Sequence, residues 1–350
     1  MVRCASFLTA FIFSVACLAQ VAKNDLKSFY DKEVMICGGW DSIFVIKGKW
    51  KKTTDDLAFP DKTFARNQYK YINSRVDSIS DFLKATVSDL SGVEARWQRN
   101  IRGDSYLPNG PVPYSFSTGF FHYYCNTNYN KILLGDETSN WIYVFVNSLS
   151  WFLRKADDWD INNDGIIKPV FQLPPKTGEW KGMHVYEPNF FSGGPARVIS
   201  RAVIIGRNGK LPWRSLTQKQ YLTGLKTSYE KQLLKFKEGS SSNWDYTQKL
   251  KYINDYVAIT NEETLEKIVI IDPRAGIWGF KGKFGKEDEG GYRLILFTAN
   301  DKYFDKSLPR YSPQLIQIMW KYNPGDAVAS SVVKQFEENF PLEKLKAMIR

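Results

Sequence analysis

The first nineteen residues constrain the rest of the chain most strongly, because they have the pattern of a cleavable secretory signal peptide. Arg3 gives a short positive region, residues 5–18 are uncharged and mainly apolar, and Cys17 and Ala19 are small residues where signal peptidase requires them. We expect cleavage before Gln20, with lipidation of Cys17 and an uncleaved membrane anchor as the alternatives. The part that folds is then the remainder of the chain, in an oxidising compartment.

Export bears directly on the cysteines, of which the chain has 4. Cys4 and Cys17 leave with the signal peptide, so Cys37 and Cys125 are the pair that remains. Two cysteines in an oxidising compartment predict one disulfide. The chain-entropy model gives a bond that closes so long a loop roughly 4–5 kcal/mol of stabilisation, less any strain.

The mature chain, about 330 residues, is long enough for one large or two ordinary domains. Hydrophobic residues are 43% of the sequence and aromatic residues 15%, which is enough for a sizeable core and excludes a disordered chain. No apolar run in it reaches the ~20 residues that span a bilayer. An acidic stretch at 157–164 suggests an N-terminal domain over 20–165 and a C-terminal domain over 166–350, and a single domain is the alternative.

Hydrophobic spacing predicts both strands and helices along the mature chain. Expected strands lie at 34–36, 43–50, 114–125, 141–147, 197–206, 292–297 and 314–320. Expected helices lie at 62–90, after a capping box at 217–220, at 246–257, at 326–340 and at 341–349. Apolar residues occupy both faces of 141–147, so this strand should be central in its sheet.

These elements occur in mixed runs without a regular βαβ rhythm. The order predicts an α+β fold with mixed or antiparallel sheets and packed helices. The packed helices should include a helical hairpin after residue 217 and two C-terminal helices.

Two segments carry a resemblance to known sequences. RNGKLPWRSLTQKQYL (Arg207–Leu222) and YFDKSLPRYSPQLIQIMW (Tyr303–Trp320) are similar to segments of uncharacterised exported proteins of Bacteroidetes-type bacteria. The resemblance implies a periplasmic or secreted protein. That family has no established activity, so the resemblance transfers no catalytic residue.

A short acidic segment matches the front of a calcium-binding loop. Asp160, Asn162 and Asp164 fall at ligand positions 1, 3 and 5, and Gly165 allows the bend at position 6. The pattern then fails, because position 12 is Phe171 instead of a bidentate glutamate. Calcium at the three ligand positions is one hypothesis, and an Asp-Gly turn between short strands is the alternative. No other cofactor is expected.

Basic residues outnumber acidic ones, 48 to 37, for a net charge of +11, or +10 once Arg3 is removed. This charge favours an anionic partner such as acidic polysaccharide or another envelope component, and nucleic acid is not expected for an exported protein. The candidate binding residues form two groups: Lys47, Lys49 and Lys51, and Trp278, Phe280, Lys281 and Lys283. The alternatives are a solvated face or a protected sheet edge for the first group and a flexible glycine-rich loop for the second.

Catalytic signatures are scarce. The chain has two histidines, His122 and His184, which excludes multi-histidine centres, and it has no G-x-S-x-G or nucleotide-binding motif. Glycoside hydrolysis needs only two carboxylates, for which Glu187, Glu137 and Asp272 are candidates. We therefore expect a non-catalytic exported protein that binds a glycan, an envelope component or a partner, with a carboxylate-dependent hydrolase as the alternative. A cleft with two carboxylates would favour the hydrolase, and a shallow aromatic or basic face would favour binding.

Overall fold

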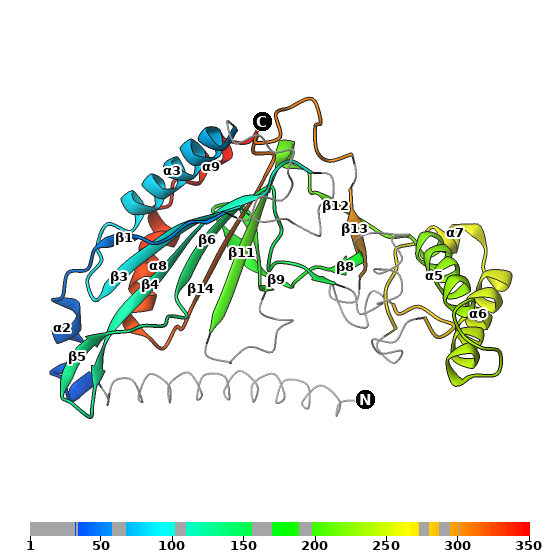
Figure 1. The fold of residues 1–350 in the computed structure, drawn as a ribbon, viewed down its shortest axis with the longest axis horizontal. Helices are drawn as coiled ribbons and strands as arrows, with labels where there is room; N and C mark the ends of the chain where they lie inside the picture. The colour runs from blue at the N-terminus through cyan, green and yellow to red at the C-terminus, as the bar shows by residue number, and fades with distance from the viewer. Residues whose placement is uncertain are drawn as a thin grey trace, which may run out of the picture.

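A mixed sheet of ten strands runs through the centre of the molecule (Figure 1). Its strands are β1 (Trp50–Lys52), β2 (Asp56–Leu57), β3 (Val93–Ile101), β4 (Tyr114–Asn126), β5 (Lys131–Leu134), β6 (Trp141–Val146), β9 (Lys176–Trp180), β10 (Met183–Tyr186), β11 (Ile199–Gly206) and β14 (Leu315–Tyr322). The order along the main path is β1–β3–β4–β6–β14–β11–β10–β9, with β2 added to β3 and β5 added to β4. β1 and β2 run parallel to β3, and the other pairs are antiparallel.

The structure is a computed structural model. It describes residues 32, 34–57, 68–101, 110–155, 170–188, 198–272, 280–286, 295–300 and 302–350.

The expected α+β class is confirmed, and the sheet joins distant parts of the chain. β6 lies between β4 and β14, which confirms its central place, and β14 also pairs with β11. Strands from both sides of residue 165 therefore share one sheet. The stretch in which we expected a domain boundary, 157–164, lies outside the described residues.

Three helices cover one face of this sheet (Figure 1): α3 (Tyr69–Thr86), α8 (Ala327–Asn339) and α9 (Leu342–Lys346). Apolar residues recur every three or four positions along α3, and this buried stripe packs with α8 and the sheet in one continuous core. The helix expected at 62–90 is thus present, with its described part shorter at both ends. Among the described residues, no helix is long and apolar enough to cross a membrane.

The opposite face is covered in part by a second, four-stranded antiparallel sheet. Its order is β12 (Trp213–Ser215), β13 (Phe297–Ala299), β8 (Val170–Gln172) and β7 (Arg154–Lys155). Phe152 packs between the two sheets, with its ring centroid 5.2 Å from Tyr186 and 5.9 Å from Trp213. The two sheets therefore share an aromatic core.

The expected helical hairpin is present, as α5 (Gln218–Leu233) and α6 (Ser241–Ile259), followed by the short α7 (Glu262–Leu265). Thr217 forms the predicted capping box, since its Oγ1 accepts a hydrogen bond from the Gln220 backbone N–H at 3.3 Å. The hairpin has its own apolar core and lies at the opposite end of the molecule from α3 (Figure 1).

The chain around the first mature cysteine differs from the prediction. We expected strands at 34–36 and 43–50. The structure has α2 (Gly39–Phe44) here instead, which overlaps the start of the second expected strand. Within the two expected ranges, Trp50 is the one residue that belongs to a strand. The two adjacent glycines that begin α2 have φ values of 93° and 82°, which interrupt an extended chain. The helical turn of α2 buries the Ile43 side chain completely. The burial of Ile43 therefore outweighs the local strand pattern.

Two other expectations shift by short distances. The strand expected at 292–297 is β13, which begins at Phe297, and residues 291–294 lie outside the described chain. We expected Pro341 to be the first helical residue of α9. It occupies the N-cap position, immediately before the helix begins.

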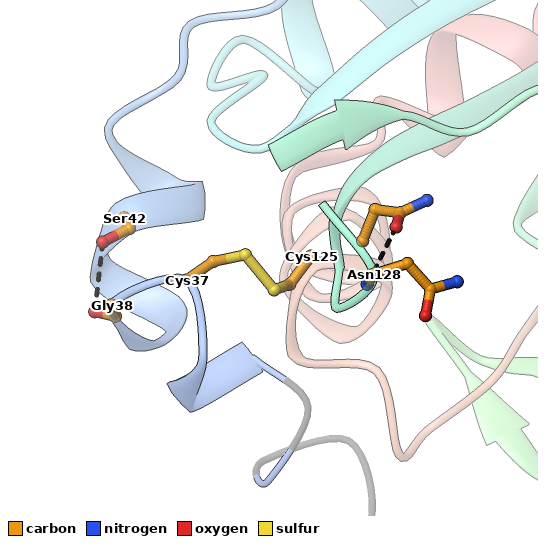
Figure 2. The surroundings of a disulfide bond; sticks show 6 residues. Cys37, Gly38, Ser42, Cys125 and Asn128 are labelled. Carbon is orange, nitrogen blue, oxygen red and sulfur yellow. Dashed lines mark hydrogen bonds between the residues drawn. A yellow bond between two sulfur atoms is a disulfide. The ribbon is translucent and has the colours of Figure 1, made fainter. Parts of the chain in front are cut away.

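The predicted disulfide is present (Figure 2). Cys37 and Cys125 are bonded, and their Cα atoms are 5.7 Å apart, within the range that the bond requires. Cys125 lies near the end of β4, where that strand pairs with β5. On the other side of the bond, Ser42 donates a hydrogen bond to the Gly38 carbonyl at 3.0 Å, which closes the start of α2. The bond therefore ties the segment before α2 to the sheet.

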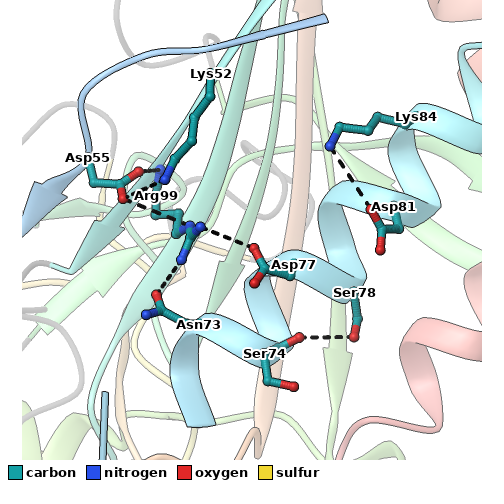
Figure 3. Close-up of polar contacts among 9 residues, drawn as sticks. All are labelled: Lys52, Asp55, Asn73, Ser74, Asp77, Ser78, Asp81, Lys84 and Arg99. Carbon is teal, nitrogen blue, oxygen red and sulfur yellow. Dashed lines mark hydrogen bonds and ion pairs between the residues drawn. The ribbon is translucent and has the colours of Figure 1, made fainter. Parts of the chain in front are cut away.

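A polar cluster joins the β1 edge of the sheet to α3 (Figure 3). Arg99 of β3 lies at its centre and donates a hydrogen bond to Asn73 at 2.6 Å. Its guanidinium is also 3.2 Å from Asp77 and 3.9 Å from Asp55. Asp55 in turn accepts a hydrogen bond from Lys52 at 3.0 Å. One arginine thus links the β1–β2 segment, β3 and α3 on the helix-covered face.

Candidate functional site

Three aromatic side chains lie on the sheet face that α3 and α8 do not cover. Trp141, Tyr143 and Phe145 alternate along β6 with aliphatic residues that pack under the helices. Their ring centroids are 5.5 Å apart for the first pair and 5.6 Å for the second, with the planes tilted by only 10° and 13°. We call these three residues the aromatic row. Tyr143 and Phe145 are buried at 5% and 6% exposed, so Trp141 is the ring of the row that remains partly accessible.

A fourth ring, Trp151, stands against one side of the aromatic row. It meets Tyr143 at 4.9 Å and Phe145 at 5.7 Å, nearly edge-on in both cases. Trp151 is 59% exposed, and its φ of 61° is rare for a bulky residue. Gln317 of β14 anchors the loop by donating a hydrogen bond to the Ser150 carbonyl at 3.1 Å. An exposed tryptophan that is held in a strained conformation points to a functional constraint.

Polar side chains lie on the other side of the aromatic row. The sheet register places Ser115 and Ser117 of β4 beside the row, and Gln98 and Asn100 of β3 one strand further. Asn100 donates a hydrogen bond to Ser117 at 3.1 Å, and Gln98 donates one to Asn100 at 3.2 Å. Among the described residues, the Ser115 hydroxyl and the Gln98 carbonyl oxygen have no hydrogen-bond partner. Both are therefore free to bind a ligand.

These groups surround a cavity of about 260 Å³, just below the ~300–1,000 Å³ of typical small-molecule sites. Its lining consists of the aromatic row, Trp151, and neutral residues of β3, β4 and the adjoining loops. Within the described part of the chain, no carboxylate lines it. We call the cavity, the aromatic row and Trp151 together the groove.

Charged residues lie at the Trp141 end of the groove. Lys321 of β14 is directly opposite Trp141 in the sheet, and Arg96 of β3 lies on the other side of the tryptophan. Arg96 forms an ion pair with Glu94 at 2.7 Å. The Lys321 ammonium lies 6.0 Å from the ring centroid of Tyr143, and burial lowers the pKa of Lys321. Burial also raises the pKa of Tyr143, so its hydroxyl stays protonated and can donate a hydrogen bond.

The first group of predicted binding residues lies at the edge of the sheet and away from the groove. Lys49 and Lys51 are exposed just before and within β1, the end strand of the main path. This position is typical of lysines that protect a sheet edge. Lys47 is also exposed, and it forms an ion pair with Asp89 at 3.2 Å.

The second predicted group does not form a surface with the first. Trp278 lies outside the described residues. Phe280 is 4% exposed and packs on rings of the hairpin core, so it is a core residue and its ring is not open for stacking. Lys281 is exposed, and Lys283 forms an ion pair with Asp272 at 3.3 Å. β1 and the hairpin are at opposite ends of the molecule (Figure 1).

The calcium hypothesis falls on residues that the structure does not describe, since Asp160, Asn162 and Asp164 lie within 156–169. Elsewhere, the described chain has no group of three or more His, Cys, Asp or Glu residues that could hold a metal ion. None of the three carboxylates considered for hydrolysis lines the groove.

The sequence carried one usable signal for this site, the alternation of aromatic residues along 141–147. We interpreted it as the mark of a central strand, which it is, and did not expect a binding surface. The polar residues of β3 and β4 have no local pattern that relates them to β6. Their place beside the aromatic row depends on strand pairing.

Comparison with family models, curated proteins and solved structures finds no match for this chain, so the groove has to be judged by the chemistry of its own residues.

Proposed function

We propose that this protein is an exported carbohydrate-binding protein and that the groove holds a short segment of glycan. The observation that carries the proposal is a pair of accessible tryptophans, the partly exposed Trp141 and the exposed Trp151, which face unpaired hydroxyl and carbonyl groups within one cavity. A sugar ring has the complementary surface, with apolar C–H groups on its faces and hydroxyl groups around its edge. The signal-like leader and the disulfide support export.

Both sides of the groove are needed to bind a sugar. Stacking removes apolar ring surface from water, which is favourable by roughly 25 cal/mol per Å². Sugar hydroxyls that leave water cost free energy unless they find new hydrogen bonds. The Ser115 hydroxyl and the Gln98 carbonyl oxygen can supply these bonds, as can the Tyr143 hydroxyl.

The lining of the groove favours binding over hydrolysis. Most glycosidases use two carboxylates about 5–10 Å apart on either side of the bond that breaks. The described lining has an aromatic and amide character and no acid. We expected a shallow aromatic or basic face for a binding protein, and the groove is instead an aromatic cavity lined by neutral polar groups.

Replacing Trp151 tests the proposal. We expect the wild-type protein to bind at least one of a panel of neutral hexose and pentose oligosaccharides in calorimetric titrations. Trp151→Ala should weaken that binding about tenfold, equal to about 1.4 kcal/mol, because it removes one stacking face. Trp244→Ala is the matched control, since Trp244 is 64% exposed on α6, away from the groove.

Equal binding by the wild-type protein and Trp151→Ala would show that the groove is not the site. Failure of the whole panel, and of the corresponding acidic oligosaccharides, to bind would remove the carbohydrate proposal. Shortened oligosaccharide recovered after a titration would support the hydrolase alternative instead.

A further inference from the structure

We propose that the groove prefers sugars that carry a negative charge beside the ring, and that Lys321 binds this charge. The inference rests on the proposed carbohydrate binding and names the class of sugar. The charged group is a carboxylate, as in a uronic acid, or a sulfate ester.

Lys321 lies on the same face of the sheet as the aromatic row. Along β14, alternate residues face the helices, so Lys321 faces the other side of the sheet. Gln317 lies on that same side, where it contacts the Trp151 loop. The register pairs Lys321 with Trp141, so the two side chains start about 4.5–5.5 Å apart. The ammonium reaches to 6.0 Å from the Tyr143 ring centroid. Lys321 therefore lies beside Trp141, the partly accessible ring of the aromatic row.

The charge of Lys321 has no counter-charge in the described part of the chain. No described carboxylate lies within ion-pair distance of its ammonium. The other cation beside the groove, Arg96, is neutralised by Glu94 at 2.7 Å. On the hairpin, Lys249 is similarly half-buried, and it pairs with Asp245 at 2.8 Å. Lys321 thus differs from Arg96 and Lys249, because a bound ligand could supply the anion that the described chain does not.

Partial burial makes this position favourable for an anion. Burial lowers the pKa of Lys321, which shows that removing water disfavours its isolated charge. A bound anion would offset that cost, and charge pairs attract several times more strongly near protein than in bulk water. A sugar stacked on Trp141 would have the Arg96–Glu94 ion pair on its β3 side. On its β14 side it would have Lys321, which has no described carboxylate partner. An acidic substituent is therefore best placed toward β14.

The test is a calorimetric titration with three oligosaccharides of equal length, a neutral hexose, a hexuronate and a sulfated hexose. We expect the wild-type protein to bind an acidic sugar at least tenfold more tightly than the neutral one. Lys321→Gln should remove this preference, and a thermal melting curve like that of the wild-type protein would show that the variant is folded. Lys321→Arg should keep most of the preference. Lys51→Gln, at the exposed sheet edge, should keep all of it.

Salt gives a second measurement on the wild-type protein alone. Raising the salt from roughly 0.05 to 0.5 M should weaken binding of the acidic sugar and leave the neutral sugar unaffected, because salt screens charges. A preference for the sulfated over the carboxylated sugar would assign the anion to a sulfate ester.

Equal binding of all three sugars, or a preference that survives Lys321→Gln, would overturn this inference and leave carbohydrate binding in place. Equal loss of preference in Lys51→Gln would also overturn it, since the effect would then come from overall charge. Failure to bind any of the three sugars, together with failure of the neutral hexose and pentose panel, would overturn the proposed function itself.

Discussion

At the scale of single residues, the groove depends on a position that has no side chain. Gly119 of β4 lies directly beside Trp141 of β6. A Cβ atom at Gly119 would come within 3.0 Å of both the Trp141 ring and the Phe121 ring, closer than ordinary contact. The indole is anchored, since its Nε1 donates a hydrogen bond to the Thr138 carbonyl at 2.8 Å. A side chain at position 119 would therefore press against the anchored Trp141 ring.

We predict that Gly119→Val destabilises the protein by about 1–3 kcal/mol through overpacking and weakens glycan binding by displacing Trp141. Denaturant unfolding and titration measure the two effects. Gly178→Val in β9 is the control, because nothing lies within 4 Å of a Cβ at that position. If both variants behave like the wild-type protein, the space beside Trp141 is not required.

At the scale of elements, the start of α8 connects the helix layer to the sheet. Asp326 caps the helix, and its Oδ1 accepts hydrogen bonds from the backbone N–H groups of Val328 at 2.9 Å and Ala329 at 3.1 Å. Its Oδ2 lies 3.6 Å from Nδ1 of His122 on β4. One carboxylate thus begins the helix and faces the strand on which the helix packs.

We predict that Asp326→Ala lowers the free energy of unfolding by about 1–2 kcal/mol, because two backbone N–H groups lose their partner. Asp326→Asn should cost no more than about 0.5 kcal/mol, since an amide oxygen can still cap the helix. Urea unfolding measures both. An asparagine variant as unstable as the alanine variant would show that the contact with His122, and not the cap, stabilises this junction.

At the scale of the whole molecule, the disulfide joins regions that are 88 residues apart. It holds the segment before α2 against the β4–β5 hairpin, beside an edge of the sheet. A covalent bond across so long a loop restricts the unfolded chain strongly.

In protein recovered from its native location, neither Cys37 nor Cys125 should react with an alkylating reagent until a reductant is added. Mass spectrometry detects the added groups. The variant with both Cys37→Ser and Cys125→Ser should lose about 2–5 kcal/mol of stability. Two freely reactive thiols in the native protein would contradict both the bond and the oxidising compartment.

The sequence by itself determined the features that depend on neighbouring residues. The apolar spacing of α3, the capping box at Thr217 and the helix start at Asp326 involve contacts within one or two turns, so local patterns predict them. The two apolar faces of 141–147 likewise predicted a central strand, and the count of mature cysteines predicted their bond. The pattern failed near Gly39, where the chain turns to bury Ile43 against residues far along the sequence.

Only the tertiary structure decided where the groove lies. The groove needs β3 and β4 on one side of β6, β14 on the other, and the Trp151 loop held by Gln317. The hydrogen bonds that pair these strands join backbone groups that are common to every residue, so no local pattern states which strands will pair. The pairing of Lys321 with Trp141, some 180 positions apart, exists because burying both sheet faces selects one strand order and one register.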